Sequence, residues 1–475
     1  MSFTGGHQST SGQSTLNIGV PVVNFKTQAS QLIYYFWLME KLLIYVSKKT
    51  SRIRYTFKLV FEEILLTDYE LTTDLDAFLS ADAPKMQYSQ KPFSDDLYFQ
   101  STGFLFKRGI ENQELDPLEF EGINVFFPVG DKLSALPFDV FSAIFFLVSR
   151  YEEYLPFKKD HHGRFTAEQS VAYRLGFLQK PVVNIWAQKI KEILLKKYPE
   201  LKYSVKNYKF RPTYDIDSAW AYSQKGLVRT VGSYLLALQR MDWYDIKERT
   251  LVLLKQKKDP FDTFDLQLQY QKKYGLKPVY FFLYAHYSRF DKNINTRNRR
   301  FKMLIKKMVD YAKIGIHPSY YTIEKPELVA VELEGLEKIV NKEVNRSRQH
   351  FLRLVLPDTY RTLINNDITD DYTMGYAAMP GFRAGICNTY FFYDLDLERE
   401  TPLRIHPFAV MDGTLRDYLK VTPADALIII KKLIDEVKAV NGTFISLWHN
   451  ESLSDKLRWK GWRRVYEELL EAASV

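Results

Sequence analysis

Two acidic residues lie close together in the stretch RPTYDIDSAW, residues 211–220, where Ile216 separates Asp215 from Asp217. In an extended strand successive side chains point to opposite faces, so both carboxylates share one face, about 7 Å apart. Two such carboxylates repel each other unless a cation, a shared proton or open water lies between them. The pair is therefore a candidate for a metal ligand beside a general base, with a solvated strand end as the alternative.

Further polar residues follow other strands of the C-terminal part. Strands are predicted at 209–217, 278–286, 313–319, 377–385, 404–412 and 442–450, with helices at 261–275, 299–313, 327–344 and 423–440. At or near the strand ends lie Asp215 and Asp217, His286, His317 and Ser319, Arg383, Asp412, and His449 with Asn450 and Glu451. Alternating strands and helices indicate parallel βαβ units, and in a closed barrel of such units the carboxyl ends meet at one mouth. We therefore predict one site, built at the mouth of a (β/α) barrel.

Carboxylates, imidazoles and a guanidinium at one mouth match the needs of metal-assisted hydrolysis. Oxygen and nitrogen ligands suit Zn²⁺ or another borderline divalent cation. Such a metal acidifies a water molecule, a carboxylate takes the proton, and a histidine protonates the leaving group. The chain has neither the G-x-S-x-G nor the H-E-x-x-H pattern, which disfavours a serine hydrolase and a zincin protease.

Residues 205–475 resemble the polysaccharide deacetylase family (NodB homology, carbohydrate esterase family 4). The whole chain looks like a bacterial subgroup of that family with an N-terminal domain of unknown function. The strings that carry the resemblance are FDVFSAIFFLVSRYEEYLPF, TYDIDSAW, GIHPSYYT, DYTMGYAAMPGFRAGICNTYFFYDL, PFAVMDGTLRDY and SLWHN. The resemblance implies a distorted (β/α) barrel of the NodB type, preceded by a smaller α/β domain.

The resemblance also implies a metal site. It makes Asp215 the base and Asp217 a metal ligand, with one residue inserted between them, and it makes His317 a second ligand. The family's next histidine position falls on Tyr321, so the third ligand is Tyr321 or, from the neighbouring strand end, His286; a pocket-wall role for His286 is the alternative.

Other family positions imply roles in catalysis and substrate binding. Arg383, in GFRAG, corresponds to the arginine that orients the base, and His449, in SLWHN, corresponds to the acid. Trp448 is expected to line the acyl pocket, and Ser319 and Asp412 are further candidates for substrate binding. Asp412 also corresponds to the aspartate that tunes the acid.

The chain divides into three predicted parts. Residues 1–38 are rich in Ser, Thr, Gly and Gln and are predicted to be disordered or an extra extension, with Met39 as a hypothetical true start. Residues 39–204 form the smaller α/β domain, with strands expected at 42–46 and 55–66 and helices at 138–155 and 183–201. Residues 158–170 are a predicted loop, in which His161 and His162 are expected to be exposed.

Composition narrows the class of protein further. The net charge is +9, but the basic clusters at 48–54 and 297–307 come without a nucleic-acid motif, so no nucleic-acid partner is expected. The single cysteine, Cys387, excludes a disulfide framework and a cysteine zinc site. No apolar run reaches the ~20 residues that span a bilayer. We expect a soluble, cytoplasmic protein, with peripheral attachment to the inner membrane and homo-oligomer formation left open.

The leading hypothesis is a metal-dependent hydrolase that removes an acyl group, in the first place acetyl, from an N-acylated sugar or glycan precursor. One alternative is a catalytically impaired barrel that serves as a glycan-binding scaffold. A second is a metal-dependent hydrolase of another C–N amide bond.

Overall fold

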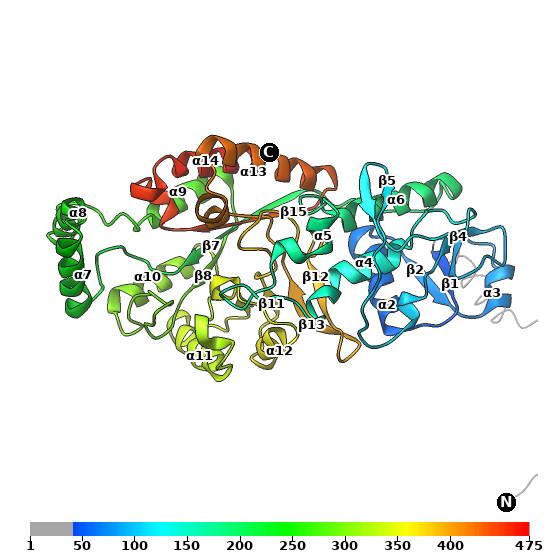
Figure 1. The fold of residues 1–475 in the computed structure, drawn as a ribbon, viewed down its shortest axis with the longest axis horizontal. Coiled ribbons are helices and arrows are strands. Elements are labelled where there is room, and N and C mark those ends of the chain that lie inside the picture. The colour runs from blue at the N-terminus through cyan, green and yellow to red at the C-terminus, as the bar shows by residue number, and fades with distance from the viewer. Residues whose placement is uncertain (1–40, 475) are drawn as a thin grey trace, which may run out of the picture.

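The computed structural model describes residues 41–474 and shows a mixed α/β protein with two principal sheets (Figure 1). The predicted extension at 1–38 and the hypothetical start at Met39 lie outside the described residues. The N-terminal sheet lies towards one end of the longest axis, and the larger sheet lies nearer the other (Figure 1). Within the described part, no helix has the length and apolar character that crossing a membrane requires.

The N-terminal sheet is parallel and has the order β2-β1-β3-β4. Its strands are β1 (Leu42–Val46), β2 (Tyr69–Thr72), β3 (Lys85–Ser89) and β4 (Leu97–Gln100). A small antiparallel pair, β5 (Leu118–Phe120) and β6 (Ile123–Val125), lies apart from it. The helices of this part are α2 (Ser51–Phe57), α3 (Leu75–Ser80), α4 (Val140–Val148), α5 (Val171–Arg174) and α6 (Val182–Lys197).

The strand predicted at 55–66 is wrong, because this segment is helical. Thr50 caps α2 by accepting a hydrogen bond from the Ile53 amide, and the helix continues into a π-helical segment, Lys58–Ile64. Apolar residues at three- to four-residue spacing, among them Ile53, Phe57 and Phe61, are buried on one face. Helical periodicity therefore prevails over the strand preference of the aromatic and β-branched residues.

The larger sheet has nine strands in the order β12-β13-β11-β10-β9-β8-β7-β15-β14. Every neighbouring pair is parallel except β12 with β13. The strands are β7 (Lys209–Ile216), β8 (Val279–Phe282), β9 (Lys313–Ile316), β10 (Arg346–Ser347), β11 (Asp370–Asp371), β12 (Tyr390–Asp394), β13 (Arg399–Ile405), β14 (Val410–Met411) and β15 (Thr443–His449). Closure of this sheet into a barrel stays a prediction.

The strand predictions that correspond to β1, β7, β8, β9 and β15 are confirmed, and the others are absent or divided. The segment 377–385 is a loop: Gly381 has φ +139°, and a Cβ there would lie 2.4 Å from the Leu178 carbonyl oxygen. The glycine thus allows a close approach of two backbones that an extended strand would not make. The predicted strand 404–412 is split between β13 and β14.

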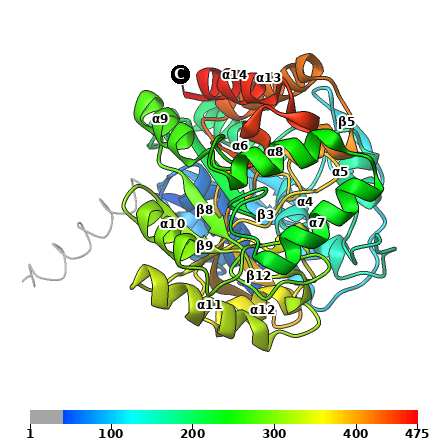
Figure 2. The ribbon, with the colours of Figure 1, turned by 90° about the vertical axis from the view of Figure 1, so that its left-hand side faces the viewer.

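Helices connect the parallel strands and cover the sheet (Figures 1 and 2). They are α7 (Leu227–Gln239), α8 (Trp243–Leu253), α9 (Phe264–Tyr274), α10 (Arg299–Val309), α11 (Glu327–Val340), α12 (Asp358–Asn365), α13 (Pro423–Ala439) and α14 (Trp462–Ser474). The four helices predicted between the strands correspond to α9, α10, α11 and α13.

The two faces of the larger sheet pack into different apolar clusters. One face joins the main core, which is continuous with that of the N-terminal part. The other face packs into a separate cluster, which includes Phe281, Tyr372, Phe408 and Leu447. The predicted site lies next to this second cluster, because Leu447 of the cluster also lines a cavity that contains Asp215, Asp217 and His317.

Candidate active site

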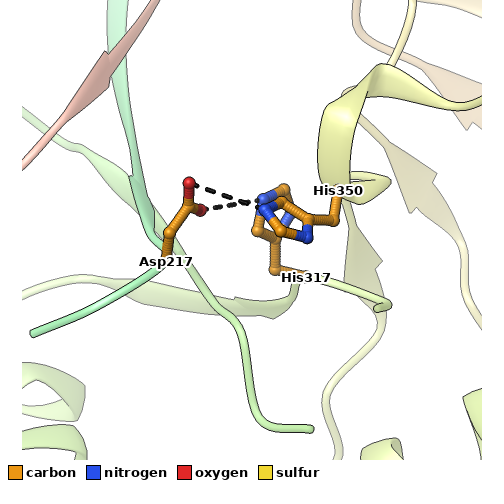
Figure 3. A group of neighbouring side chains, drawn as sticks. All are labelled: Asp217, His317 and His350. Carbon is orange, nitrogen blue, oxygen red and sulfur yellow. Dashed lines mark ion pairs between the residues drawn. The ribbon is translucent and has the colours of Figure 1, made fainter. Parts of the chain in front are cut away.

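Three side chains at the carboxyl ends of parallel strands point toward one another (Figure 3). Asp217 directly follows β7, His317 follows β9, and His350 lies three residues after β10. The Nε2 atom of His317 is 3.3 Å from one carboxylate oxygen of Asp217, and the Nε2 atom of His350 is 3.6 Å from the other. One oxygen and two nitrogens thus lie within 4.8 Å of one another, close enough to share one cation.

The surroundings of these three residues fit a metal site. His317 donates from Nδ1 to the Arg348 carbonyl oxygen at 2.5 Å, and His350 bonds through Nδ1 to Asp291 at 2.8 Å. Because a carbonyl only accepts, the Nδ1 of His317 carries the proton and its Nε2 keeps a lone pair for a metal. The Oδ1 atom of Asp217 is buried and has no hydrogen-bond partner among the described residues. An unsatisfied carboxylate oxygen beside two oriented imidazoles suits a borderline divalent cation.

The charges in this cluster shift its pKa values. Burial alone would raise the pKa of Asp217, but the neighbouring histidines, chiefly through the charge of His350, hold it well below its ordinary value. Burial alone would lower the pKa of His350, but the charges of Asp217 and Asp291 raise it to about 9. A proton on His350 therefore stabilises the cluster, and it is the proton that a cation would displace on binding.

Asp215 lies beside the cluster without belonging to it. Its Oδ2 atom is 3.7 Å from the Nε2 atom of His317, and the carboxylate is 2% exposed. The shared face predicted for Asp215 and Asp217 is confirmed, because both approach the same imidazole. Asp215 is not one of the three residues whose ligand atoms lie within 4.8 Å of one another. Its position beside that group therefore suits a general base better than a metal ligand.

The arginine that contacts Asp215 is Arg348. Its Nη1 atom donates to Asp215 at 2.8 Å and to the Thr213 hydroxyl at 2.8 Å, and its Nε atom donates to the Tyr372 carbonyl at 2.9 Å. The guanidinium is fully buried and lies 4.6 Å from the centre of the Phe281 ring. Arg348 therefore holds the Asp215 carboxylate in a fixed orientation.

The role predicted for Arg383 is wrong. Arg383 pairs through Nε and Nη2 with Glu153, at 2.9 and 2.6 Å, and donates from Nη1 to the Gly375 carbonyl. Glu153 also accepts from Arg150 at 2.8 Å, and all three side chains are buried. Arg383 thus stabilises the contact between the N-terminal part and the loop 375–385.

His449 approaches the cluster from β15, the neighbour of β7. Its Nδ1 atom bonds to Asp412 at 2.7 Å, its amide donates to the same carboxylate at 2.8 Å, and its Nε2 atom is 3.8 Å from Asp217. Burial would lower the pKa of His449, but the charge of Asp412 and its hydrogen bond raise it well above the ordinary value. His449 is thus held protonated beside the cluster, as a general acid must be.

A cavity of about 200 Å³ contains these groups. Its lining includes Asp215, Asp217, His317, Gln349, His350, His449, Trp459, Arg458 and, from the N-terminal part, Arg164. Arg164 reaches it from the 158–170 loop by donating to the Phe351 carbonyl at 2.7 Å. In that loop His161 is exposed as expected, but His162 is buried and bonds to the Tyr320 hydroxyl at 3.0 Å.

Five other predicted site residues do not line this cavity in the described structure. His286 is exposed, and Tyr321 is half-buried outside the ligand cluster. Trp448 is buried against Tyr466, with ring centres 5.1 Å apart, because successive residues of β15 point to opposite faces and its neighbours Leu447 and His449 face the cavity. Ser319 is buried, and its amide donates to Glu332. Asp412 is fully buried behind His449, so it contacts that imidazole and does not face the cavity.

Residues 42–199 match a family model described as a family of unknown function (DUF7033). That match covers the N-terminal part and, of the cavity lining named above, only Arg164. The chain has no significant match among curated proteins.

Among solved structures, similar folds come from three bacteria. A protein from Mycobacterium smegmatis, assigned as a polysaccharide deacetylase, has TM-score 0.36 and 13% identity over 56% of this chain and 85% of that chain. The polysaccharide deacetylase Bc1974 from Bacillus cereus has TM-score 0.30 and 11% identity over 56% and 87%. BA3943 from Bacillus anthracis, a CE4 family pseudoenzyme, has TM-score 0.25 and 11% identity over 56% and 61%. At these TM-scores the likeness carries no inference about function.

Proposed function

We propose that this protein is a metal-dependent hydrolase that removes an acyl group, in the first place acetyl, from an N-acylated sugar or glycan precursor. The observation that carries the proposal is the Asp217–His317–His350 cluster, which lies beside an arginine-bound carboxylate and a protonated histidine. The resemblance of residues 205–475 to polysaccharide deacetylases supports the choice of bond. We further propose that residues 205–475 form the catalytic domain, a NodB-type barrel, and residues 39–204 a separate α/β domain.

The side chains divide the reaction between them. A divalent cation held by Asp217, His317 and His350, with Zn²⁺ the first candidate, would polarise the acyl carbonyl and acidify a water molecule. Asp215 accepts the proton of the attacking water, and Arg348 orients it. His449 donates a proton to the departing nitrogen, and Asp412 orients it. Asp215 and His449 are register partners on β7 and β15, so base and acid lie side by side across two strands.

The direct test is acetate release from a panel of N-acetylated sugars, before and after treatment with a chelator. We expect release by the metal-loaded protein, loss with chelator and recovery when Zn²⁺ is added back. Release from cyclic amides but from no acylated sugar would favour the alternative of another C–N bond. Absence of release from both, with metal bound, would favour the scaffold alternative.

Metal content gives a second, independent prediction. His350→Ala is expected to lower the affinity for Zn²⁺ at least about 100-fold, because one of three donors is lost, and Asp291→Asn about 10–100-fold, because only the orientation of His350 is lost. Competition with a fluorescent chelator measures both. His286→Ala is the matched control and should bind as the parent does. Equal affinity in His350→Ala and the parent would exclude His350 as a ligand.

The pH dependence of catalysis should report on Asp412. A general acid works in its protonated form, so a raised pKa of His449 extends activity to higher pH. Asp412→Asn removes the charge that raises that pKa. We expect the alkaline limb of the pH profile of kcat/KM to move to lower pH. If the limb stays in place, the group whose ionisation causes it is not His449.

A further inference from the structure

Helices α7 and α8 form a hairpin that projects from one end of the molecule. Figure 1 shows it beyond the larger sheet, and Figure 2, seen from that end, shows it in front of the rest of the chain. The hairpin interrupts the crossover between β7 and α9, ten residues after Asp217. Eleven of the 25 exposed large apolar side chains in residues 41–474 fall within 227–254. Exposure at this density distinguishes the hairpin from the rest of the surface.

The apolar side of α7 faces outward. Leu227, Val228, Val231, Leu235 and Leu238 are 81, 86, 49, 63 and 48% exposed. At about 100° per residue these five positions fall within an arc of about 100°, so they form one stripe along the helix. Toward α8 the helix presents smaller or polar groups: Ala237 is buried, and the Tyr234 hydroxyl bonds to Thr250 at 2.9 Å. An amphipathic helix with this orientation has its apolar stripe without a protein partner in the described chain.

The tip of the hairpin adds larger side chains. Met241, Trp243 and Tyr244 are 73, 66 and 48% exposed. Trp and Tyr are the residues that most often lie at the boundary between lipid and water.

The hairpin is also strongly basic. Residues 225–258 contain eight Lys and Arg against three Asp and Glu. Two of the acids are paired within the hairpin, Asp245 with Arg249 and Glu248 with Lys257. Arg240, Lys247 and Lys255 are exposed. The hairpin therefore carries an excess of positive charge in addition to its apolar stripe.

We propose that the α7–α8 hairpin docks on the surface of an anionic lipid bilayer. An exposed apolar stripe on a basic amphipathic helix, with Trp beside it, is the pattern of a helix that lies in the interface of a membrane. Anionic headgroups complement the excess of Lys and Arg. A second copy of this chain fits less well, because two basic hairpins would repel each other on contact. The inference does not depend on the proposed hydrolase activity.

The position of the hairpin links this surface to the candidate site. A groove of about 370 Å³ is lined by Tyr244 and Glu248 of α8 and by Arg458 and Trp459. The last two residues also line the active-site cavity. A docked hairpin would therefore bring this groove, which shares Arg458 and Trp459 with the cavity, close to the bilayer.

Vesicle flotation of the whole chain tests the proposal. The parent protein should float with vesicles of phosphatidylglycerol and phosphatidylcholine and much less with phosphatidylcholine alone, and high salt should weaken its binding. Leu235→Glu with Leu238→Glu should lower the bound fraction about tenfold or more, because both side chains would leave the lipid. Ile428→Glu on α13 is the matched control, since Ile428 is 68% exposed on another helix, and should bind as the parent does.

Three outcomes would overturn the proposal. The first is a parent protein that does not float, and the second is a double variant that floats as well as the control. The third is a dimer, seen by light scattering without lipid, that the double variant abolishes, because that result would assign the stripe to a second copy. Circular dichroism of the double variant must match the parent; if it does not, Arg240→Glu with Lys247→Glu, both at exposed positions, tests the charge requirement in its place.

Discussion

Asp215→Asn is expected to lower the rate of acyl-group release by about 10³-fold, within the range that a general base contributes. Asparagine keeps the shape of the side chain and can still bond to Arg348, but it cannot take a proton from water. Because Asp215 lies outside the ligand cluster, the affinity for Zn²⁺ should change little. Acetate release and metal affinity, measured on the same preparation, separate the two roles.

The matched control is Asp82→Asn, at an exposed position in the N-terminal part, which should leave the rate unchanged. Loss of metal together with activity in Asp215→Asn would make Asp215 a ligand instead of the base. Full activity in the variant would remove Asp215 from the mechanism. Either result would reject the division of roles between Asp215 and Asp217.

Glu153→Ala should be the most destabilising of the substitutions considered, by about 3–5 kcal/mol in the free energy of unfolding. The change leaves the guanidinium of Arg383, 2% exposed, without its carboxylate partner, and it removes one partner of Arg150, 1% exposed. Urea unfolding measures the effect. Glu192→Ala is the control, because Glu192 is 68% exposed in its pair with Lys189 and should cost less than about 1 kcal/mol.

The ion pairs of Glu153 with Arg383 and Arg150 also predict how the stability of the protein depends on pH. Burial would raise the pKa of Glu153, but Arg383 and Arg150 lower it below its ordinary value. A carboxyl with a lowered pKa stabilises the folded state above its unfolded pKa and loses that contribution as the pH falls through the folded value. The difference in stability between the parent and Glu153→Ala should therefore shrink in acid, and a constant difference would argue against an ionised Glu153.

The sequence pattern located part of the site for a physical reason. Alternation along β7 places Asp215 and Asp217 on one face, and the apolar runs of β9 and β15 mark the strands that end near His317 and at His449. The two residues missed, Arg348 and His350, follow β10, which is two residues long and has no periodicity of its own. The only sign of Arg348 and His350 in the sequence is the presence of basic residues in the string RSRQH, residues 346–350. Nothing in that string distinguishes it from an exposed basic loop.

Other errors come from contacts that sequence does not display. The family motif predicts that Arg383 contacts Asp215, whereas its partner in the structure is Glu153, 230 positions earlier in the chain. The loop 377–385 has the apolar content of a strand, but its backbone bonds to Leu178 and Ala409 instead of a ladder. The motif SLWHN predicts Trp448 in the acyl pocket, whereas strand alternation beside His449 points its side chain to the opposite face of the sheet.

Arg348 contacts both Asp215 and His317, and these two contacts together limit how far the two side chains can move relative to each other. Its guanidinium holds Asp215, and its carbonyl oxygen, one residue past β10, holds the imidazole of His317. Thermal displacement of this segment therefore carries both groups in the same direction. Their separation should fluctuate less than the position of either one relative to the rest of the sheet, so Asp215 and His317 would keep their spacing while the cavity around them changes shape.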